Sequence, residues 1–345
     1  MALHLPEGAV VTIRTLRNLL RCVTPRRLFN MAAVLVSYTI SDLTKRSVVW
    51  GMPYTVTLEP TNRCNLRCPE CPSGNGEMVR PLGMMDYDAF TTLIDELAPE
   101  TFYVQLFFQG EPFINPRLAD MIRYARSKRM YVSVSTNAHY LRPDTVRALF
   151  ASGLDRLIVS IDGMSEATYQ EYRVGGSLAK VLAALDLLDA ERAASPSSME
   201  VVLQFLITRA NEHEIPALRA LAAKHRAAVA LKTIQVYSLE SAEQFLPREE
   251  KYRRYTIEAG ELRMKGALRN RCVRLWERSV ITWDGVVVPC CFDKNAAYPL
   301  GTVNGRRFRD IWRSEEYHAF RRRILAGRRD VPMCTNCTEG LRVYR

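Results

Sequence analysis

The chain has 345 residues, of which 48% are hydrophobic and 25% are charged. This composition excludes a disordered chain, and the length suffices for one large core with a smaller appendage. The net charge of +11 lies at the ends, since residues 1–50 hold seven basic against two acidic residues and residues 302–345 hold eleven against five. The neutral middle argues against a nucleic-acid groove, and the basic ends fit either an acidic partner or lipid headgroup or an ordinary solvated surface.

Residues 1–50 are predicted to form two helices that are separated at Thr24-Pro25, because proline disfavours a helical residue before it. The first helix has an apolar face made of Ile13, Leu16, Leu20 and Val23, beside a basic face made of Arg14, Arg17 and Arg21. We expect the apolar face to pack against the following domain. Contact of this basic helix with an anionic membrane is the alternative.

From residue 54 onward, short apolar runs alternate with segments of helical character. The runs occupy residues 54–60, 101–110, 131–137, 154–163, 199–211 and 229–238. Six β/α units in series predict a parallel sheet with right-handed crossovers. Six are too few for a closed eight-stranded barrel, so a partial (β/α)6 barrel or an open doubly wound sheet is expected, with ligands at the C-terminal ends of the strands.

The remaining sequence predicts a linker and a small cysteine-bearing appendage. Residues 239–270 are charged and helical in character, residues 278–292 form a hairpin that turns at Asp284-Gly285, and residues 314–325 form a helix. We expect this appendage to have little core of its own. The predicted domains are an N-terminal extension (1–50), a barrel (51–240), a linker (241–270) and an iron–sulfur domain (271–345).

Eight of the nine cysteines fall into two close groups, at 64, 68 and 71 and at 272, 290, 291, 334 and 337, and Cys22 stands apart. A chain of this size needs no disulfide staples, so metal binding in a reducing compartment is the better interpretation. No run reaches the eighteen or so apolar residues of a membrane span, and no signal peptide is evident. We therefore expect a cytoplasmic protein with no nucleic-acid partner.

The stretch CNLRCPEC, residues 64–71, places three cysteines in the loop after the first predicted strand. A cubane cluster normally takes four thiolates, so Cys64, Cys68 and Cys71 would leave one iron open, as a catalytic metal site keeps one position for its substrate. A zinc site is the less favoured alternative, because zinc wants a fourth protein ligand nearby.

These features resemble the radical S-adenosylmethionine (SAM) enzymes over residues 52–240. The resemblance implies a partial (β/α)6 barrel, a [4Fe-4S] cluster held by Cys64, Cys68 and Cys71, and SAM chelating the open iron. It also implies reductive cleavage of SAM to a 5′-deoxyadenosyl radical, with electrons from a flavodoxin- or ferredoxin-type donor. Residue by residue, it assigns SAM contacts to Gln109, Gly110, Glu111, Pro112, Asn137, Ser160, Asp162 and Arg173.

Two of these assignments keep an alternative. Gln109 stands where the family has the first glycine of its Gly-Gly-Glu-Pro motif, which puts that contact in doubt. Arg173 would grip the SAM carboxylate through a two-donor fork, but an ion pair with Glu171 is an equally good interpretation.

The C-terminal cysteines supply a complete set of four thiolates. Twelve residues lie between Cys272 and Gly285, and four lie between Gly285 and Cys290. The pair Cys334-x2-Cys337 follows. Neighbouring side chains on a strand face opposite ways, which favours Cys290 over Cys291 as the ligand. Four thiolates also suit structural zinc.

The pattern resembles the SPASM/twitch extension of radical SAM enzymes. Because the sequence ends eight residues after Cys337, we expect a single auxiliary [4Fe-4S] cluster, the twitch form. Such a fully ligated cluster would accept the electron that a substrate radical releases.

The substrate stays open. We expect dehydrogenation of a small molecule or of a lipid or cell-envelope precursor, with Lys232, Gln204 and His139 as candidate catalytic residues. Maturation of a ribosomal peptide is less favoured, because only about fifty residues precede the barrel. A lipid substrate would bring residues 1–50 to the inner membrane surface. A non-enzymatic function is the other alternative: an iron–sulfur redox sensor or electron-transfer module without catalytic activity.

Overall fold

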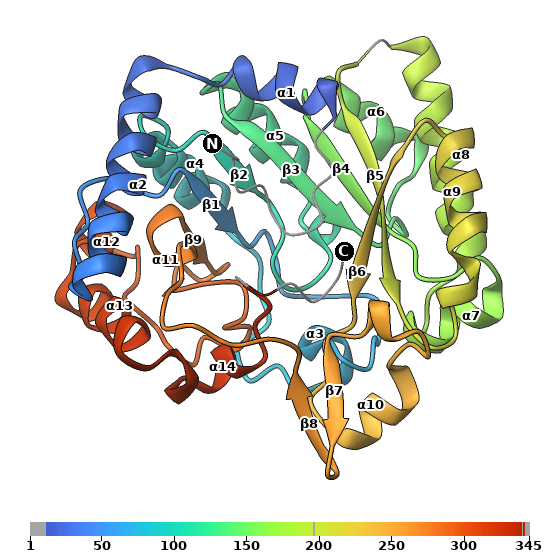
Figure 1. Ribbon diagram of the computed structural model, residues 1–345. Coiled ribbons are helices and arrows are strands. Elements are labelled where there is room, and N and C mark those ends of the chain that lie inside the picture. Colours follow the sequence, from blue (N-terminus) through green and yellow to red (C-terminus); the bar gives the residue numbers. More distant parts are fainter. Residues whose placement is uncertain (1–11, 196, 340, 342–345) are drawn as a thin grey trace.

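In the computed structural model, which describes residues 12–195, 197–339 and 341, the larger sheet has eight strands in the order β10-β9-β1-β2-β3-β4-β5-β6 (Figure 1). The six predicted strands are parallel neighbours in chain order. They are β1 (Thr55–Leu58), β2 (Tyr103–Gln105), β3 (Tyr131–Thr136), β4 (Arg156–Ser160), β5 (Glu200–Ile207) and β6 (Ala228–Thr233). The predicted series of β/α units is therefore confirmed.

Helices connect these strands and cover the outside of a partial barrel, which settles the fold in favour of the barrel over the doubly wound sheet. The connecting helices are α4 (Tyr87–Leu97), α5 (Leu118–Ser127), α6 (Pro143–Ala151), α7 (Glu166–Tyr172), α8 (Leu178–Ala194) and α9 (Ile215–Lys224). Two of them start with a side-chain cap: the Asp86 carboxylate accepts from the first free amides of α4, and Ser165 caps α7. No helix in the described ranges has the length and apolar character needed to cross a bilayer.

The N-terminal extension forms the two predicted helices, α1 (Ile13–Leu20) and α2 (Pro25–Thr44), and Cys22 between them is fully buried. The expected packing of the apolar face is wrong. Helix α1 turns Thr15, Asn18 and Leu19 toward the barrel and leaves Ile13, Leu16 and Leu20 exposed. The loops that lead into the strands present backbone carbonyls at this end of the barrel, and the inward polar side chains donate to them.

Residues 239–270 are not a helical linker. After the short helix α10 (Leu239–Phe245) and a 3-10 turn, the chain forms an antiparallel hairpin of β7 (Tyr255–Glu258) and β8 (Glu261–Met264). The hairpin lies below β6 in Figure 1. Tyr255 at its start is buried, and its hydroxyl bonds to the backbone of Val236. The segment thus packs onto the barrel mouth, which charge content alone did not reveal.

The C-terminal hairpin is present as predicted, with Gly285 in a left-handed conformation (φ 85°) at its turn. Its first strand, however, extends the barrel sheet. Strand β9 (Arg278–Ile281) pairs in parallel with β1, and β10 (Val287–Val288) pairs with the other edge of β9. The C-terminal segment also contains the helices α11 (Arg274–Glu277), α12 (Phe308–Trp312), α13 (Glu315–Gly327) and α14 (Pro332–Thr335).

The expectation of an appendage with little core is also wrong. Trp276, Trp312 and Tyr317 are fully buried and belong to the same hydrophobic core as the barrel strands. Their polar atoms are satisfied within the fold: the Trp276 and Trp312 indoles donate to the carbonyls of Val48 and Gly51. The C-terminal segment is therefore held rigidly against the barrel, which fixes the distance between the two cysteine groups.

Candidate functional site

The three-cysteine loop follows β1 and opens onto a cavity of about 410 Å³, which we call the cysteine-loop cavity. Cys64, Cys68 and Cys71 all line it. The short helix α3 (Pro72–Asn75) begins directly after Cys71, and a Cβ at Gly74 would stand 2.5 Å from the amide nitrogen of Cys68. Glycine is thus required for the loop to fold back on itself.

Most of the predicted SAM contacts line the same cavity from the ends of the strands. They are Gly110, Glu111, Asn137, Ser160 and Arg173, joined by Gln204 and Lys232 from β5 and β6. Gly110 has φ 76°, and a Cβ there would come within 2.6 Å of the backbone after β1. Its close approach to the cysteine loop is possible only for glycine.

Glu111 is the best-positioned acidic group of the cavity. It is 1% exposed, its Oε1 accepts from the Thr136 hydroxyl at 2.7 Å, and its Oε2 accepts from the Asn137 amide at 2.7 Å. Burial raises the pKa of this carboxyl to about 7, against the opposing effect of these hydrogen bonds. The carboxylate is therefore fixed in place. A cationic partner, such as an ammonium group, would stabilise its ionised form.

Arg173 reaches the cysteine loop, and its ion-pair partner is Asp162 instead of Glu171. Its Nε lies 2.5 Å from Asp162 Oδ2, and its Nη1 lies 3.8 Å from Cys68 Sγ. Asp162 is 1% exposed and does not line the cavity. Asp162 therefore holds Arg173 in place. It does not reach the cavity, where the resemblance assigned it a contact with SAM.

Besides Asp162, three predicted residues lie outside the cysteine-loop cavity. Gln109 accepts from the Ser73 hydroxyl and faces the barrel interior, and Pro112 starts a buried 3-10 turn. His139 uses both ring nitrogens on backbone groups: Nε2 accepts from the Ser177 amide at 2.8 Å, so Nδ1 donates to the Asn137 carbonyl. Burial lowers the pKa of this imidazole, and it lines neither described cavity.

Arg254, from the segment predicted as a linker, was missed by the sequence interpretation. It is 8% exposed and lines the cysteine-loop cavity, where its Nε and Nη2 donate to Thr233. Its Nη1 is buried without a hydrogen-bond partner. A buried guanidinium with an unpaired donor facing a cavity is suited to an anion such as a carboxylate. No motif signals this residue.

A second cavity of about 310 Å³, the barrel cavity, lies among the strands. It shares a set of lining residues with the cysteine-loop cavity, namely Phe107, Phe108, Gln204, Lys232, Gln235 and Lys294. Five cationic and no acidic residues line it, the cations being Arg156, Lys232, Arg274, Arg278 and Lys294. The three arginines also pair with Glu200, Glu339 and Glu277 outside the cavity lining. The lining as a whole favours an anionic occupant.

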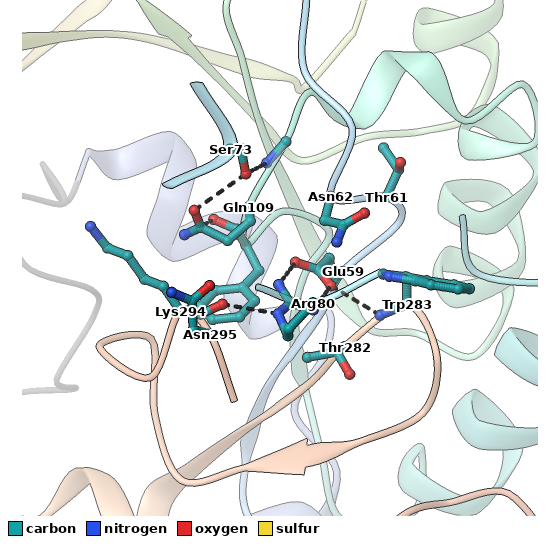
Figure 2. Close-up of polar contacts among 12 residues, drawn as sticks. Glu59, Thr61, Asn62, Ser73, Arg80, Gln109, Thr282, Trp283, Lys294 and Asn295 are labelled. Carbon is teal, nitrogen blue, oxygen red and sulfur yellow. Dashed lines mark hydrogen bonds and ion pairs between the residues drawn. The ribbon is translucent and has the colours of Figure 1, made fainter. Parts of the chain in front are cut away.

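A buried ion pair fastens the cysteine loop to the C-terminal segment (Figure 2). Arg80 grips Glu59 with two bonds of 2.7 and 2.8 Å, and Glu59 is fully buried at the end of β1. Glu59 also accepts from the Trp283 amide, while Arg80 Nε donates to the Lys294 carbonyl. A bidentate ion pair fixes the relative position of its two residues. It therefore holds the loop in register with the C-terminal hairpin.

The four C-terminal cysteines of the predicted set converge on one enclosed cavity, the four-cysteine cavity, lined by Cys272, Cys290, Cys334 and Cys337. Cys291 is exposed and lines the barrel cavity on the other side. The cavity holds about 20 Å³, which suits a water molecule, so its walls must move outward to admit a cluster. Arg274 and Phe292 line both this cavity and the barrel cavity.

The donor chemistry of both groups fits iron–sulfur clusters. In the described part of the chain, no three histidine, cysteine or acidic side chains are gathered so as to hold a single metal ion; a cluster of several irons is larger, and its thiolates stand farther apart. Burial raises the pKa of both Cys64 and Cys334 to about 11, so their thiolates need a positive partner. Arg328 donates to Cys337 Sγ at 3.3 Å, and its buried Nε has no partner, which suits a cluster sulfur.

Comparison with known families matches both cysteine regions. Residues 58–215 match the family described as the radical SAM superfamily. Residues 272–338 match the SPASM family, described as an iron–sulfur cluster-binding domain. The first match contains the cysteine-loop cavity residues up to Leu206, and the second contains all four cysteines of the four-cysteine cavity.

Curated relatives align over most of the chain. The tungsten-containing aldehyde ferredoxin oxidoreductase cofactor-modifying protein of Pyrococcus furiosus is 26% identical, over 81% of this chain and 86% of that protein. The PqqA peptide cyclase of Rhodopseudomonas palustris is 28% identical, over 84% of this chain and 80% of that protein. The crystal structure of BtrN in complex with AdoMet and 2-DOIA aligns with a TM-score of 0.54 and 18% identity, over 84% of this chain and 94% of that one, and shows the shared fold.

Proposed function

The chain belongs to the radical SAM superfamily and carries a C-terminal SPASM iron–sulfur domain, and from this premise we propose that it oxidises an anionic substrate held in the barrel cavity. Its cofactors are a [4Fe-4S] cluster, SAM and auxiliary iron–sulfur bound by the SPASM domain as a cluster. Because the chain is a radical SAM enzyme, the alternative of a non-catalytic redox module no longer stands.

One observation carries the proposal: the barrel cavity borders both cysteine sites. It shares Lys232 and Gln204 with the cysteine-loop cavity and Arg274 and Phe292 with the four-cysteine cavity. When bound, the reduced cluster and SAM supply a 5′-deoxyadenosyl radical that removes a hydrogen atom from the substrate. The substrate must then lose a proton and an electron to become an oxidised product, and the barrel cavity adjoins the four-cysteine cavity that would house an electron acceptor.

The chain's own residues would do the rest. Cys64, Cys68 and Cys71 would hold the first cluster, and Glu111 and Arg254 would hold the amino and carboxylate groups of SAM. Lys232 and Gln204, which line both cavities, would orient the substrate, and its proton would pass to solvent. Cys272, Cys290, Cys334 and Cys337 would hold a single auxiliary [4Fe-4S] cluster that takes the electron. A flavodoxin- or ferredoxin-type protein would supply electrons to the first cluster.

For the substrate class, the cationic lining favours a small organic acid or a phosphate-bearing lipid or cell-envelope precursor. The site cysteines are free thiols, which persist in a reducing compartment. We therefore place the reaction in the cytoplasm, with residues 1–50 as the segment that would meet the inner membrane. A peptide is the second candidate substrate, because a PqqA peptide cyclase is among the relatives.

The test of this proposal is anaerobic reconstitution with iron, sulfide, SAM and dithionite, followed by offering deuterated candidate substrates. Formation of 5′-deoxyadenosine that carries deuterium from an anionic small molecule or lipid precursor would support the proposal. Deuterium transfer from a peptide alone would favour the second candidate. Absence of 5′-deoxyadenosine from a preparation that contains both clusters would contradict the reaction itself.

Arg254→Gln is expected to weaken SAM binding by about 10- to 100-fold, because a hydrogen bond to a charged group is worth about 1.5–3 kcal/mol. Titration of the reconstituted protein with SAM measures this affinity. Arg253→Gln is the matched control, since Arg253 donates to Pro247 and Arg248 backbone oxygens and does not line the cavity. Equal losses in the two variants would show that Arg254 does not contact SAM.

SAM affinity is expected to rise about tenfold between pH 6 and pH 8. The pKa of Glu111 is raised to about 7, so its carboxyl is mostly protonated at pH 6 and mostly ionised at pH 8. Only the ionised form attracts the SAM ammonium. In Glu111→Gln the affinity should be low and independent of pH over this range; a wild-type slope that survives in this variant would assign the titration to another group.

Arg328→Gln is expected to lower the reduction potential of the auxiliary cluster by roughly 20–65 mV, the equivalent of one hydrogen bond of 0.5–1.5 kcal/mol for a one-electron couple. Donation to cluster sulfurs favours the reduced, more negative state. A potentiometric titration followed by electron paramagnetic resonance measures it. The exposed neighbour Arg329 gives the control, Arg329→Gln, which should leave the potential unchanged.

A further inference from the structure

The outward faces of α1 and α2 are apolar, which is the reverse of an ordinary surface helix. On α1, Ile13, Leu16 and Leu20 are 89%, 49% and 62% exposed. On α2, Phe29, Val36 and Leu43 recur every seven residues along one stripe and are also exposed. We call these six residues the N-terminal apolar face.

The inward faces of both helices are polar because the closed end of the barrel presents backbone carbonyls. Arg27 donates to the carbonyls of Ala98, Lys128 and Arg129, at 2.6–3.0 Å. Asn30 donates to Met52 and accepts from its amide. Rotating either helix to bury its apolar face would break these bonds and leave buried carbonyls unpaired. The exposure of the apolar face is thus built into the fold.

Exposed apolar side chains are concentrated here to a degree that a solvated surface does not explain. Of the fourteen large hydrophobic residues that are exposed in the described part of the chain, eight lie between Ile13 and Trp50. Scattered single residues of this kind are normal, but a contiguous group marks an interaction site. This group covers less than an eighth of the sequence.

Basic side chains lie beside the apolar face and determine the kind of partner. Arg14, Arg17 and Arg21 are exposed on α1. An open groove of about 430 Å³ runs beside them, lined by Ile13, Arg14, Arg17, Asn18, Ser197 and Ser198. Two guanidinium groups and two hydroxyls next to an apolar residue suit a phosphate headgroup whose acyl chains lie against the helices.

We propose that α1 and α2 form a docking surface for an anionic phospholipid bilayer. The two helices lie in the plane of the headgroups, with the N-terminal apolar face in the acyl boundary and Arg14, Arg17 and Arg21 on lipid phosphates. Both contact segments that lead into strands, and the cysteine loop follows the end of β1 (Figure 1).

The surface is tested by co-sedimentation of the reconstituted full-length protein with vesicles of phosphatidylcholine, with or without 30% phosphatidylglycerol. The wild type should bind the anionic vesicles at least tenfold more tightly than the neutral ones. Leu16→Gln/Leu20→Gln/Phe29→Gln should lose at least tenfold in affinity for the anionic vesicles. Arg14→Gln/Arg17→Gln/Arg21→Gln should lose roughly a hundredfold there, at about fivefold per basic residue.

The matched control replaces three exposed apolar residues elsewhere, Val79→Gln/Leu82→Gln/Ile257→Gln, and should bind as the wild type does. Equal binding by the wild type and the apolar variant would overturn the proposal. So would a wild-type dimer that ignores vesicles and becomes monomeric in the apolar variant, because the face would then join two copies. Formation of 5′-deoxyadenosine in the same samples reports the reaction separately, so failure of one proposal is distinguishable from failure of the other.

Discussion

Cys68→Ala is expected to abolish 5′-deoxyadenosine formation and to halve the iron content, from about eight to about four atoms per chain. Cys68 lies in the middle of the three-cysteine loop, is 5% exposed, and faces Arg173 in the cysteine-loop cavity. Two thiolates do not hold a cubane with an open iron. The variant therefore has no cluster at this site that could receive an electron or bind SAM. Iron analysis and chromatography of the reaction mixture measure both effects.

The matched control is Cys22→Ala. Cys22 is fully buried in the N-terminal extension and belongs to neither cysteine group, so this variant should keep all of its iron and its activity. Cys68→Ala protein that still forms 5′-deoxyadenosine at the wild-type rate would contradict the assignment of the open cluster to this loop.

Cys334→Ala is expected to separate the two halves of the reaction. The variant should lose about half of its iron and all oxidised product, yet still cleave SAM to 5′-deoxyadenosine. The physical reason is the separation of the sites: Cys334 lines the four-cysteine cavity and no part of the cysteine-loop cavity. Without an acceptor, a substrate radical has no route for its electron. Product and 5′-deoxyadenosine are measured in the same reaction with the substrate that the wild type converts.

Cys291→Ser is the control for this variant, because Cys291 is adjacent to Cys290 but faces the barrel cavity. It should keep the full iron content. Loss of iron from Cys291→Ser equal to that from Cys334→Ala would move the ligand from Cys290 to Cys291. Undiminished product from Cys334→Ala would contradict the electron-acceptor role.

The barrel could be predicted from the sequence because each β/α unit carries its own local signal. Buried parallel strands appear as short apolar runs. Five of the six predicted runs contain the observed strand, and the sixth, 229–238, overlaps β6, which begins at Ala228. The three-cysteine loop could be placed at the barrel mouth for the same reason, since a loop that follows a parallel strand lies at the C-terminal edge of the sheet.

The N-terminal helices and residues 239–270 could not be predicted, because long-range contacts decide them. The apolar spacing on α1 predicts a buried face only if an apolar surface lies next to it. The closed end of the barrel instead presents backbone carbonyls, which accept from Arg27 and Asn30 of α2. The hairpin β7–β8 is rich in charge because its outer surface is exposed, and its one buried aromatic, Tyr255, is too weak a pattern to signal a strand.

The site was predicted where a motif exists and missed where side chains converge from distant segments. The resemblance to a family motif points to Glu111, and spacing points to the seven cysteines. The ion pair of Asp162 with Arg173, the unpaired Nη1 of Arg254 and the five cations of the barrel cavity do not. Those depend on which side chains the strands and the C-terminal segment bring together, and the attachment of β9 to β1 was not foreseen.

The central claim is that one cluster site is open to SAM and the other is closed. Electron paramagnetic resonance of the dithionite-reduced protein, recorded with and without SAM, tests it most directly. We predict two [4Fe-4S] signals, of which one shifts on addition of SAM and disappears in Cys68→Ala, while the other is unchanged by SAM and disappears in Cys334→Ala. Two signals that both shift with SAM, or that both ignore it, would contradict the claim.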